Sequence, residues 1–342
     1  MSRPAHPKRG RKAENRAVVP AEMEAVALDE FGPPSVLTQR TVPVPRPGPE
    51  EVLIAVHAAG VGVWDAKIRD GTWADDDIEF PLILGTDGAG VIAEIGERVR
   101  RLHVGDRVWA YTYDNPKGGF YAQYVAVSTK HVAALPKSLT MLQGAAGAVT
   151  GLTALQGCDD HLEISRGQTV LIFGASGAVG TLAVQFAARY RGARVIAIAS
   201  GSNARTLLEK LGADAVIDGR RRGALERIKE AAPDGLDAIL ALAGGPMLTA
   251  SIGLIKHGGR VAYPNGVEPN PRRRRRVRVV PYDADVSPTK FAELGRAVGK
   301  IRLVVPIAAT YQLGHAAKAH ARIERGHVVG RIALTIRGAA RS

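Results

Sequence analysis

The chain of 342 residues is 46% apolar, which is enough for two domains with sizeable cores. Its net charge of +13 is uneven. Residues 1–20 hold six Lys or Arg against one Glu, residues 272–278 hold six Arg, and the rest of the chain is nearly balanced. A single cysteine, Cys158, excludes an internal disulfide and a four-thiolate zinc site. The longest apolar stretch, 170–188, combines a strand, a glycine turn and a helix, so we expect no membrane span.

Residues 1–20 lack the apolar segment of a secretory signal, and we expect a cytoplasmic protein. Their Pro, Lys and Arg content predicts a disordered basic extension. An arm that binds nucleic acid is the alternative.

From Glu22 to about Lys137, short apolar runs such as 52–56 and 90–93 are separated by Gly, Pro and Asp, which predicts a β-rich region. The apolar period changes near Leu139, and residues 142–162 predict a helix. A doubly wound parallel sheet is predicted next, with strands at 169–173, 194–199, 215–217, 237–242 and 260–263 and helices at 179–190, 204–211, 224–231 and 247–255. The last predicted elements are helices at 290–299 and 311–326 and a strand at 330–336.

The segment Gly174–Gly180 stands between the apolar strand 169–173 and the helical pattern that begins at Val179. Strand, glycine turn and helix in this order are typical of a dinucleotide site. Glycines allow a tight turn and a close approach of the backbone to a pyrophosphate, and the helix N-terminus supplies N–H groups. An ordinary glycine turn is the alternative. The predicted cofactor contacts are Gly174, Ser176, Gly177, Ala178, Val179 and Gly180.

The residues after the second strand predict which dinucleotide is bound. An NAD site usually has Asp or Glu about 20 residues past the glycines, where it binds the ribose hydroxyls. Here no carboxylate appears before Glu209, and Ser200, Asn203 and Arg205 offer donors and a positive charge to a 2′-phosphate. We therefore expect NADPH rather than NADH. Alternatively, Ser202 or Asn203 only caps the following helix.

Nine short motifs, in order along residues 22–337, resemble the medium-chain dehydrogenase/reductase superfamily in its zinc-free quinone-oxidoreductase branch. The resemblance implies a GroES-like catalytic domain, made from both ends of the chain, around a nucleotide domain. It places the active site in the cleft between them and adds Thr150 to the cofactor contacts. The motifs are Ala59–Gly71, Leu84–Val91, Val104–Val108, Tyr121–Val125, Thr150–Ala154, Gly174–Gly180, Leu211–Asp214, Gly258–Val261 and Gly326–Arg331.

The expected fold class is α/β, with a GroES-like β-rich catalytic domain and a Rossmann domain built on a doubly wound parallel sheet. The predicted divisions are the basic extension (1–20), the first part of the catalytic domain (21–137), the nucleotide-binding domain (138–285) and the second part of the catalytic domain (286–342).

A first departure from the superfamily concerns metal. Its zinc alcohol dehydrogenases carry a Cys ahead of the Asp at 65 and a Gly-His-Glu where this chain has Gly85–Asp87. Catalytic zinc needs three protein ligands of the His, Cys or carboxylate type. Because Val63, Trp64 and Thr86 are poor zinc ligands, we expect no metal.

A second departure concerns the acceptor. Quinone oxidoreductases usually have Asn-Pro ahead of the same Asp, where this chain has Gly62-Val63-Trp64. The predicted substrate pocket contains Gly62, Trp64 and Asp65. The missing Asn leaves the identity of the acceptor open.

Without zinc, the cofactor performs the chemistry and the protein orients and polarises the acceptor. We expect hydride transfer from NADPH to a small electron-poor acceptor, whose oxygen then needs hydrogen-bond donors and a proton. Candidate donors are Tyr111, Tyr113, Lys67 and backbone N–H groups near Gly62. Asp65 either orders its loop or orients a donor, and a plain turn role is the alternative. The two tyrosines share a strand face, which packing also explains.

Three functions stay open at this point. They are a quinone reductase, an enoyl reductase acting on an α,β-unsaturated thioester or ketone, and an NADPH-binding regulatory or nucleic-acid-binding protein without turnover. Only the two arginine-rich segments support the third.

The segment Arg276–Val279 alternates charged and apolar residues, which predicts a strand with one buried face. It follows the last strand of the nucleotide domain, so we expect it at the sheet edge. The resemblance implies dimers that pair such edges, and we expect a homodimer with Val277 and Val279 in its interface. A solvated arginine loop over Arg272–Arg278 is the alternative.

Overall fold

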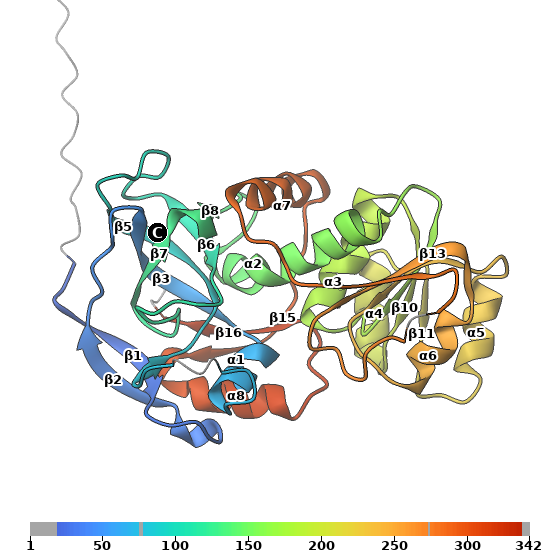
Figure 1. Ribbon diagram of the computed structural model, residues 1–342, viewed down its shortest axis with the longest axis horizontal. Helices are drawn as coiled ribbons and strands as arrows, with labels where there is room; N and C mark the ends of the chain where they lie inside the picture. Colours follow the sequence, from blue (N-terminus) through green and yellow to red (C-terminus); the bar gives the residue numbers. More distant parts are fainter. Residues whose placement is uncertain (1–18, 75–77, 273, 337–342) are drawn as a thin grey trace, which may run out of the picture.

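The computed structural model describes residues 19–74, 78–272 and 274–336, so the predicted basic extension lies almost wholly outside the described residues. Figure 1 shows two parts side by side, one rich in strands and one in which helices flank a single sheet. The predicted α/β class is confirmed.

The β-rich part contains a small and a large sheet. In the small sheet, β1 (Glu22–Leu28) pairs antiparallel with β2 (Thr38–Pro43) and β4 (Leu82–Ile83). The large sheet has the order β15 (Ile307–Gln312), β16 (Arg331–Thr335), β3 (Glu51–Val61), β5 (Asp87–Ile95), β6 (Arg107–Tyr111) and β8 (Val132–Ala134), with β7 (Tyr124–Ser128) also paired to β3.

Strand β3 organises the large sheet, because β5, β7 and β16 all pair with it. Its side chains are buried along almost its whole length, as expected of an apolar strand covered on both faces. Since β16 lies about 270 residues after β3, this part is assembled from two distant stretches of the chain. Its helical elements are η1 (Pro34–Val36), α1 (Val63–Arg69), η2 (Thr129–His131), η5 (Leu313–His315) and α8 (Ala316–Glu324).

The second part is built on a parallel sheet of order β11-β10-β9-β12-β13-β14. Numbered from β9, this is the strand order 3-2-1-4-5-6 of dinucleotide-binding folds, in which ligands bind at the carboxyl edge where the order reverses. The strands are β9 (Thr169–Phe173), β10 (Arg194–Ile198), β11 (Ala215–Ile217), β12 (Leu236–Ala241), β13 (Ile255–Pro264) and β14 (Arg278–Tyr282). The helices are α3 (Ala178–Gln185) with a π-turn η4 (Phe186–Tyr190), α4 (Ser202–Leu211), α5 (Ala224–Ala231) and α6 (Pro246–Ile252).

Helices α2 (Met141–Gln156), which continues into the π-turn η3 (Gly157–His161), and α7 (Pro288–Ile301) lie at the junction of the two parts (Figure 1). Thr140 and Gln143 form a capping box that starts α2, and the helix is then buried on nearly every side because its residues are small or apolar. One hydrophobic cluster runs from the large sheet through α2 and α7 into the part built on the parallel sheet, with the Trp109 and Phe291 rings 5.6 Å apart.

Three predicted elements differ from the structure. The helix expected at 311–326 starts only at Ala316, because residues 307–312 form the edge strand β15. This strand pairs with β16, and its residues alternate between exposed and half-buried positions. The helix expected at 247–255 ends at Ile252, and Ile255 already belongs to β13. The strand expected from Arg276 starts at Arg278, because Arg276 has φ of +66° and turns the chain instead. Helix α1 was not predicted.

None of the helices in the described ranges combines the length and apolar character that crossing a membrane requires.

A buried histidine ties α8 to the rest of the β-rich part. His320 is fully buried, with Arg69 Nη1 3.2 Å from its Nδ1 and Tyr121 Oη 3.0 Å from its Nε2. Because arginine only donates, Nδ1 accepts and Nε2 carries the proton. Burial, and then the Arg69 charge, lower the pKa of His320 to about 3, so the ring stays neutral in the folded state.

This histidine predicts a specific loss of stability in acid. Between pH 6.5 and about 3 the unfolded chain binds a proton at His320 that the folded chain cannot, so the free energy of unfolding falls as the pH falls. From pH 7 to pH 5 the loss is about 2 kcal/mol. Urea unfolding at both pH values should show this loss in the natural protein, beyond that of His320→Gln. An equal loss in both proteins would contradict the assignment.

Candidate active site

The glycine turn lies where β9 passes into α3, at the carboxyl edge of the parallel sheet. Gly174 has φ of +82°, and the Gly177 N–H donates to its carbonyl oxygen at 3.2 Å. Residues 176–179 are half-exposed, although the strand and helix on either side are mostly buried. The turn therefore presents a helix N-terminus to the surface, as a pyrophosphate site requires.

Gly177 and Gly180 differ in whether the protein leaves room for a side chain. A Cβ on Gly180 would come within 2.5 Å of the Gly174 carbonyl oxygen, so this glycine is needed for the packing of the turn itself. A Cβ on Gly177 would have its nearest neighbour at 3.5 Å, and Gly177 has an extended backbone that any residue adopts. Nothing within the described chain therefore demands glycine at 177, which is what a close-binding ligand would explain.

The three residues predicted to bind a 2′-phosphate lie at the same sheet edge. Asn203 and Arg205 are exposed in the first turns of α4, and Ser200 precedes that helix. The alternative that Ser202 or Asn203 caps the helix is wrong, because the cap is Gly201 and no side chain bonds to it.

The structure adds a carboxylate that inspection of the sequence missed. Ser200 Oγ donates to Asp218 Oδ1 at 2.7 Å. Asp218 directly follows β11, which is the parallel neighbour of β10, so the two strand ends meet at one edge. The sequence feature that could have revealed this carboxylate is that a polar residue follows each of the adjacent strands, Ser200 after β10 and Asp218 after β11.

A second group of polar residues, the Asp65 cluster, consists of Asp65, Asp87 and Arg331 and is almost fully buried. Arg331 Nη2 donates to Asp87 Oδ1 at 2.8 Å. Asp65 Oδ2 accepts the Gly62 N–H at 2.7 Å and so fixes the start of α1. This bond supports the loop-ordering role for Asp65, and it removes the Gly62 N–H from the predicted donors because that proton is already engaged.

Burial governs the charges of this cluster. Desolvation and then the Asp87 charge raise the pKa of Asp65 to about 7, although Arg331 opposes the shift. Desolvation also raises the pKa of Asp87 to about 6, against the attraction of Arg331. Asp65 Oδ1 and Asp87 Oδ2 have no hydrogen-bond partner among the described residues. At neutral pH we therefore assign the ionised form to Asp87, beside Arg331, and a partly protonated form to Asp65.

Trp64 covers the space beside Gly62. A Cβ on Gly62 would lie 2.3 Å from Trp64 Cε2, so the indole occupies the place that a side chain at 62 would need. The ring is held by a hydrogen bond of 2.6 Å from its Nε1 to Thr86 Oγ1 and by the Arg331 guanidinium 4.6 Å from its centre. No group of three His, Cys, Asp or Glu side chains in the described part of the chain could hold a metal ion.

The other predicted site residues are not all gathered here. Tyr111 is half-buried opposite Asp87 on β6, and burial followed by the Asp87 and Asp65 charges raises its pKa. Tyr113 lies beyond the end of β6, so the prediction that it shares a strand face with Tyr111 is wrong. Its hydroxyl donates to the Trp73 carbonyl at 3.1 Å.

Lys67, a further predicted donor, is exposed on α1. Thr150 is buried in α2 and its hydroxyl donates to the Ala146 carbonyl.

One loop joins the two groups. The Gly330 N–H donates to the Ser176 carbonyl oxygen at 2.9 Å, and the next residue is Arg331 of the Asp65 cluster. Gly330 has φ of +87°, and a Cβ there would meet the Pro306 carbonyl at 2.4 Å. The glycine turn and the Asp65 cluster are thus adjacent.

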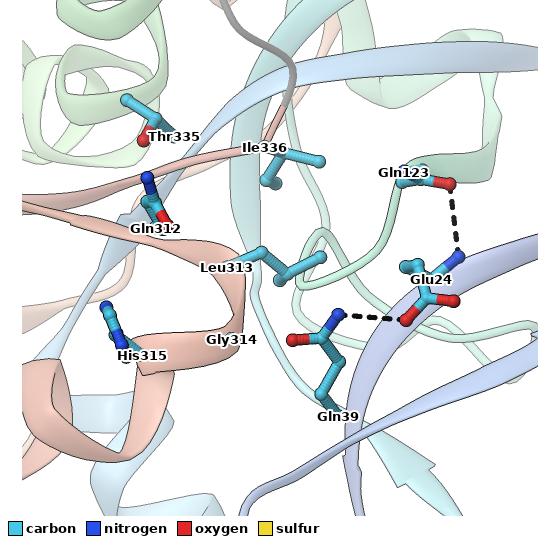
Figure 2. Close-up of a pocket in the computed structure, with 9 residues that line it drawn as sticks. All are labelled: Glu24, Gln39, Gln123, Gln312, Leu313, Gly314, His315, Thr335 and Ile336. Atoms are coloured by element: carbon cyan, nitrogen blue, oxygen red, sulfur yellow. Dashed lines mark hydrogen bonds between the residues drawn. The ribbon is translucent and has the colours of Figure 1, made fainter.

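A cavity of about 400 Å³ lies elsewhere in the β-rich part. Figure 2 shows Glu24 hydrogen-bonded to Gln39 and, through its backbone N–H, to Gln123. None of the predicted site residues lines this cavity. Its lining residues are Glu24, Gln39, Gln123, Gln312, Leu313, Gly314, His315, Thr335 and Ile336.

Known proteins match both parts of the chain. The "Alcohol dehydrogenase GroES-like domain" family model matches residues 48–137, and the "Zinc-binding dehydrogenase" family model matches residues 178–270. The quinone oxidoreductase of Sus scrofa is 34% identical over 312 residues, which are 87% of this chain and 93% of that protein. The chloroplastic NADPH-dependent alkenal/one oxidoreductase of Arabidopsis thaliana is 31% identical and covers 93% of this chain, with 81% of its own length matched.

A solved structure agrees with these relatives. The quinone oxidoreductase from Coxiella burnetii superposes with a TM-score of 0.80 at 30% identity, over 92% of this chain and all of that one. The chain belongs to the medium-chain dehydrogenase/reductase superfamily. Within it the chain falls in the quinone-oxidoreductase-like branch, and it is a nicotinamide-dependent oxidoreductase with a small-molecule acceptor. The GroES-like and Rossmann architecture is confirmed, and the alternative without turnover is set aside.

The two glycines of the turn should respond differently to substitution. Gly177→Val has room within the protein, so it should fold normally but lose more than about tenfold in NADPH affinity, because its branches enter the pyrophosphate space. Gly180→Ala should instead lower the free energy of unfolding by about 1–3 kcal/mol through overpacking. Calorimetric titration and thermal melting measure both. Unchanged NADPH affinity in folded Gly177→Val would make the turn merely structural.

Proposed function

We propose that this protein transfers a hydride from NADPH to a quinone or a similarly electron-poor acceptor, without a metal ion, where the glycine turn meets the Asp65 cluster. The observation that carries the proposal is the hydrogen bond from the Gly330 N–H to the Ser176 carbonyl at 2.9 Å. It holds the half-exposed glycine turn beside the loop that delivers Arg331. This supports a dinucleotide site next to the predicted substrate pocket of Gly62, Trp64 and Asp65.

Bound NADPH supplies a hydride, and the protein's share is to bind, orient and polarise. Gly174, Ser176 and Gly177 would hold the pyrophosphate, with Ala178 and Val179 at the start of α3. Ser200, Asn203 and Arg205 would hold the adenosine ribose and its 2′-phosphate.

Negative charge on the acceptor oxygen requires a donor. Tyr111 suits this role, because it lies opposite Asp87 of the Asp65 cluster and a tyrosine hydroxyl is protonated at neutral pH. Asp65, whose Oδ1 has no hydrogen-bond partner among the described residues and whose pKa burial raises to about 7, would supply the proton that the reduced acceptor takes up. Trp64 Nε1 donates to Thr86 Oγ1 and leaves the Thr86 proton for a further acceptor.

An enoyl reductase is the second candidate, because the chain lacks a residue that quinone oxidoreductases usually have near the acceptor. The indole fills the space beside Gly62, so the amide that quinone oxidoreductases usually carry there has no counterpart. Similarity to an alkenal/one oxidoreductase agrees with this candidate.

The proposal is tested by following NADPH absorbance with a panel of quinones, enones and enoyl thioesters. Oxidation with a quinone, one NADPH per hydroquinone formed, supports the first candidate. Turnover of enones or thioesters alone selects the second. No oxidation with any acceptor, in protein that binds NADPH, would overturn the proposal.

Arg205 should favour NADPH over NADH. Its guanidinium is exposed and pairs only loosely, at 3.8 Å, with Glu209, so it can turn to a phosphate. Losing a charge-assisted bond costs about 1.5 kcal/mol once solvent screening is included. Arg205→Gln should therefore raise the Michaelis constant for NADPH about tenfold and leave that for NADH unchanged. Equal use of both cofactors by the natural protein would contradict the assignment of Arg205 to the 2′-phosphate.

Metal independence is measured by chelation. Val63, Trp64 and Thr86 offer no zinc ligands, and the indole fills the space between Gly62 and Thr86. Activity should survive exhaustive treatment with a chelator, and elemental analysis should find no stoichiometric zinc. Zinc at one per chain, with activity lost on its removal, would contradict this.

We also propose a homodimer formed along β14. This strand ends the parallel sheet, and Val277 and Val279 are only half-buried against their own domain. Light scattering should give a dimer for the natural protein and weaker association for Val279→Asp, while a melting curve checks that the variant is folded. A monomeric natural protein, or a folded variant that dimerises equally well, would contradict a dimer interface along β14.

A further inference from the structure

A second loop contributes to the pocket predicted for the 2′-phosphate. β10 and β11 run parallel with Ile198 opposite Ile217, so the residues that follow them emerge at one edge. Ser200 follows the first strand and Asp218 follows the second, and they are joined by the 2.7 Å hydrogen bond. A carboxylate therefore stands beside the hydroxyl that was expected to serve a phosphate.

Asp218 is held as an anion by groups that a phosphate would also use. The bond from Ser200, followed by the Arg220 backbone N–H at 3.1 Å, lowers the pKa of this carboxyl. Arg221 Nε lies 3.6 Å from its other oxygen. Each donor that serves Asp218 is thus lost to a cofactor phosphate for as long as the carboxylate keeps it.

The same loop also brings cations. Arg220 and Arg221 are exposed beside Asp218, and Arg205 lies on the first turns of the neighbouring helix α4. Arg220 Nη2 is 2.8 Å from Nε2 of His327, in the loop that leads to Gly330. These three guanidinium groups favour a phosphate, and the Asp218 carboxylate opposes it.

We propose that Asp218 sets the cofactor choice of this protein: it competes with the 2′-phosphate for Ser200 and Arg221, and it accepts from the 2′-hydroxyl of a cofactor that lacks the phosphate. A charge of −1 repels the phosphate, whereas a carboxylate suits ribose hydroxyls. Selectivity is a difference of two affinities, and Asp218 reduces that difference while the arginines enlarge it. This inference rests on the proposed nicotinamide dinucleotide site at the glycine turn.

The variant Asp218→Asn removes the charge but keeps an oxygen for Ser200 and adds an N–H that a phosphate can accept. It should tighten NADP⁺ binding by about tenfold and leave NAD⁺ binding equal or weaker. The matched control is Asp234→Asn, because Asp234 is an exposed carboxylate just ahead of β12, at the opposite edge of the parallel sheet. Arg221→Gln should weaken NADP⁺ binding alone.

Calorimetric titration with NADP⁺ and NAD⁺ measures these affinities without depending on turnover. A rise in the ratio of the two dissociation constants for Asp218→Asn, with none for Asp234→Asn, is the expected result. An unchanged ratio in Asp218→Asn, with both cofactors bound, would overturn the role of Asp218 and leave the cofactor site standing. If the natural protein binds neither cofactor, the proposed function itself fails, and this inference fails with it.

Discussion

The buried ion pair between Asp87 and Arg331 is the interaction on which the rest of the site depends. Asp87 begins β5 and Arg331 begins β16, and β3 runs between these strands. A Cβ on Gly60 of β3 would come within 2.5 Å of Asp87 and 2.6 Å of Arg331, so the pair fits only because that residue is glycine. Removing one partner of such a pair typically costs about 3–5 kcal/mol, because the other charge is left uncompensated.

The position of Arg331 links stability to function. The guanidinium of Arg331 lies over Trp64 and opposes the rise in the pKa of Asp65. Arg331 also directly follows Gly330, whose N–H donates to the glycine turn. The site therefore gathers its charge from distant stretches of chain without any metal ligand set among the described residues. Burial and then the Asp87 charge raise the pKa of Asp65, and Arg331 opposes this only in part because it is bonded to Asp87.

The sequence predicted those parts of the site that are formed by residues contiguous in the chain. The glycine turn was recognisable because strand, turn and helix are contiguous. The structure has β9 at the predicted bounds, and α3 together with η4 lies within a residue of the predicted helix. Asp218 was missed because its approach to Ser200 follows from the pairing of β10 with β11. The engagement of the Gly62 N–H by Asp65 and the cover that Trp64 gives to Gly62 depend on side-chain placement, which no periodicity reports.

The proposed reaction is a hydride transfer from a nicotinamide to a small acceptor with no metal ion. Single-turnover oxidation of NADPH by a quinone, in the presence of a chelator, tests it most directly when NADPH is compared with the same cofactor deuterated at both positions of C4. We expect slower oxidation of the deuterated cofactor, because the bond to that hydrogen breaks in the observed step. Equal rates for the two cofactors, or a rate that disappears on chelation, would contradict it.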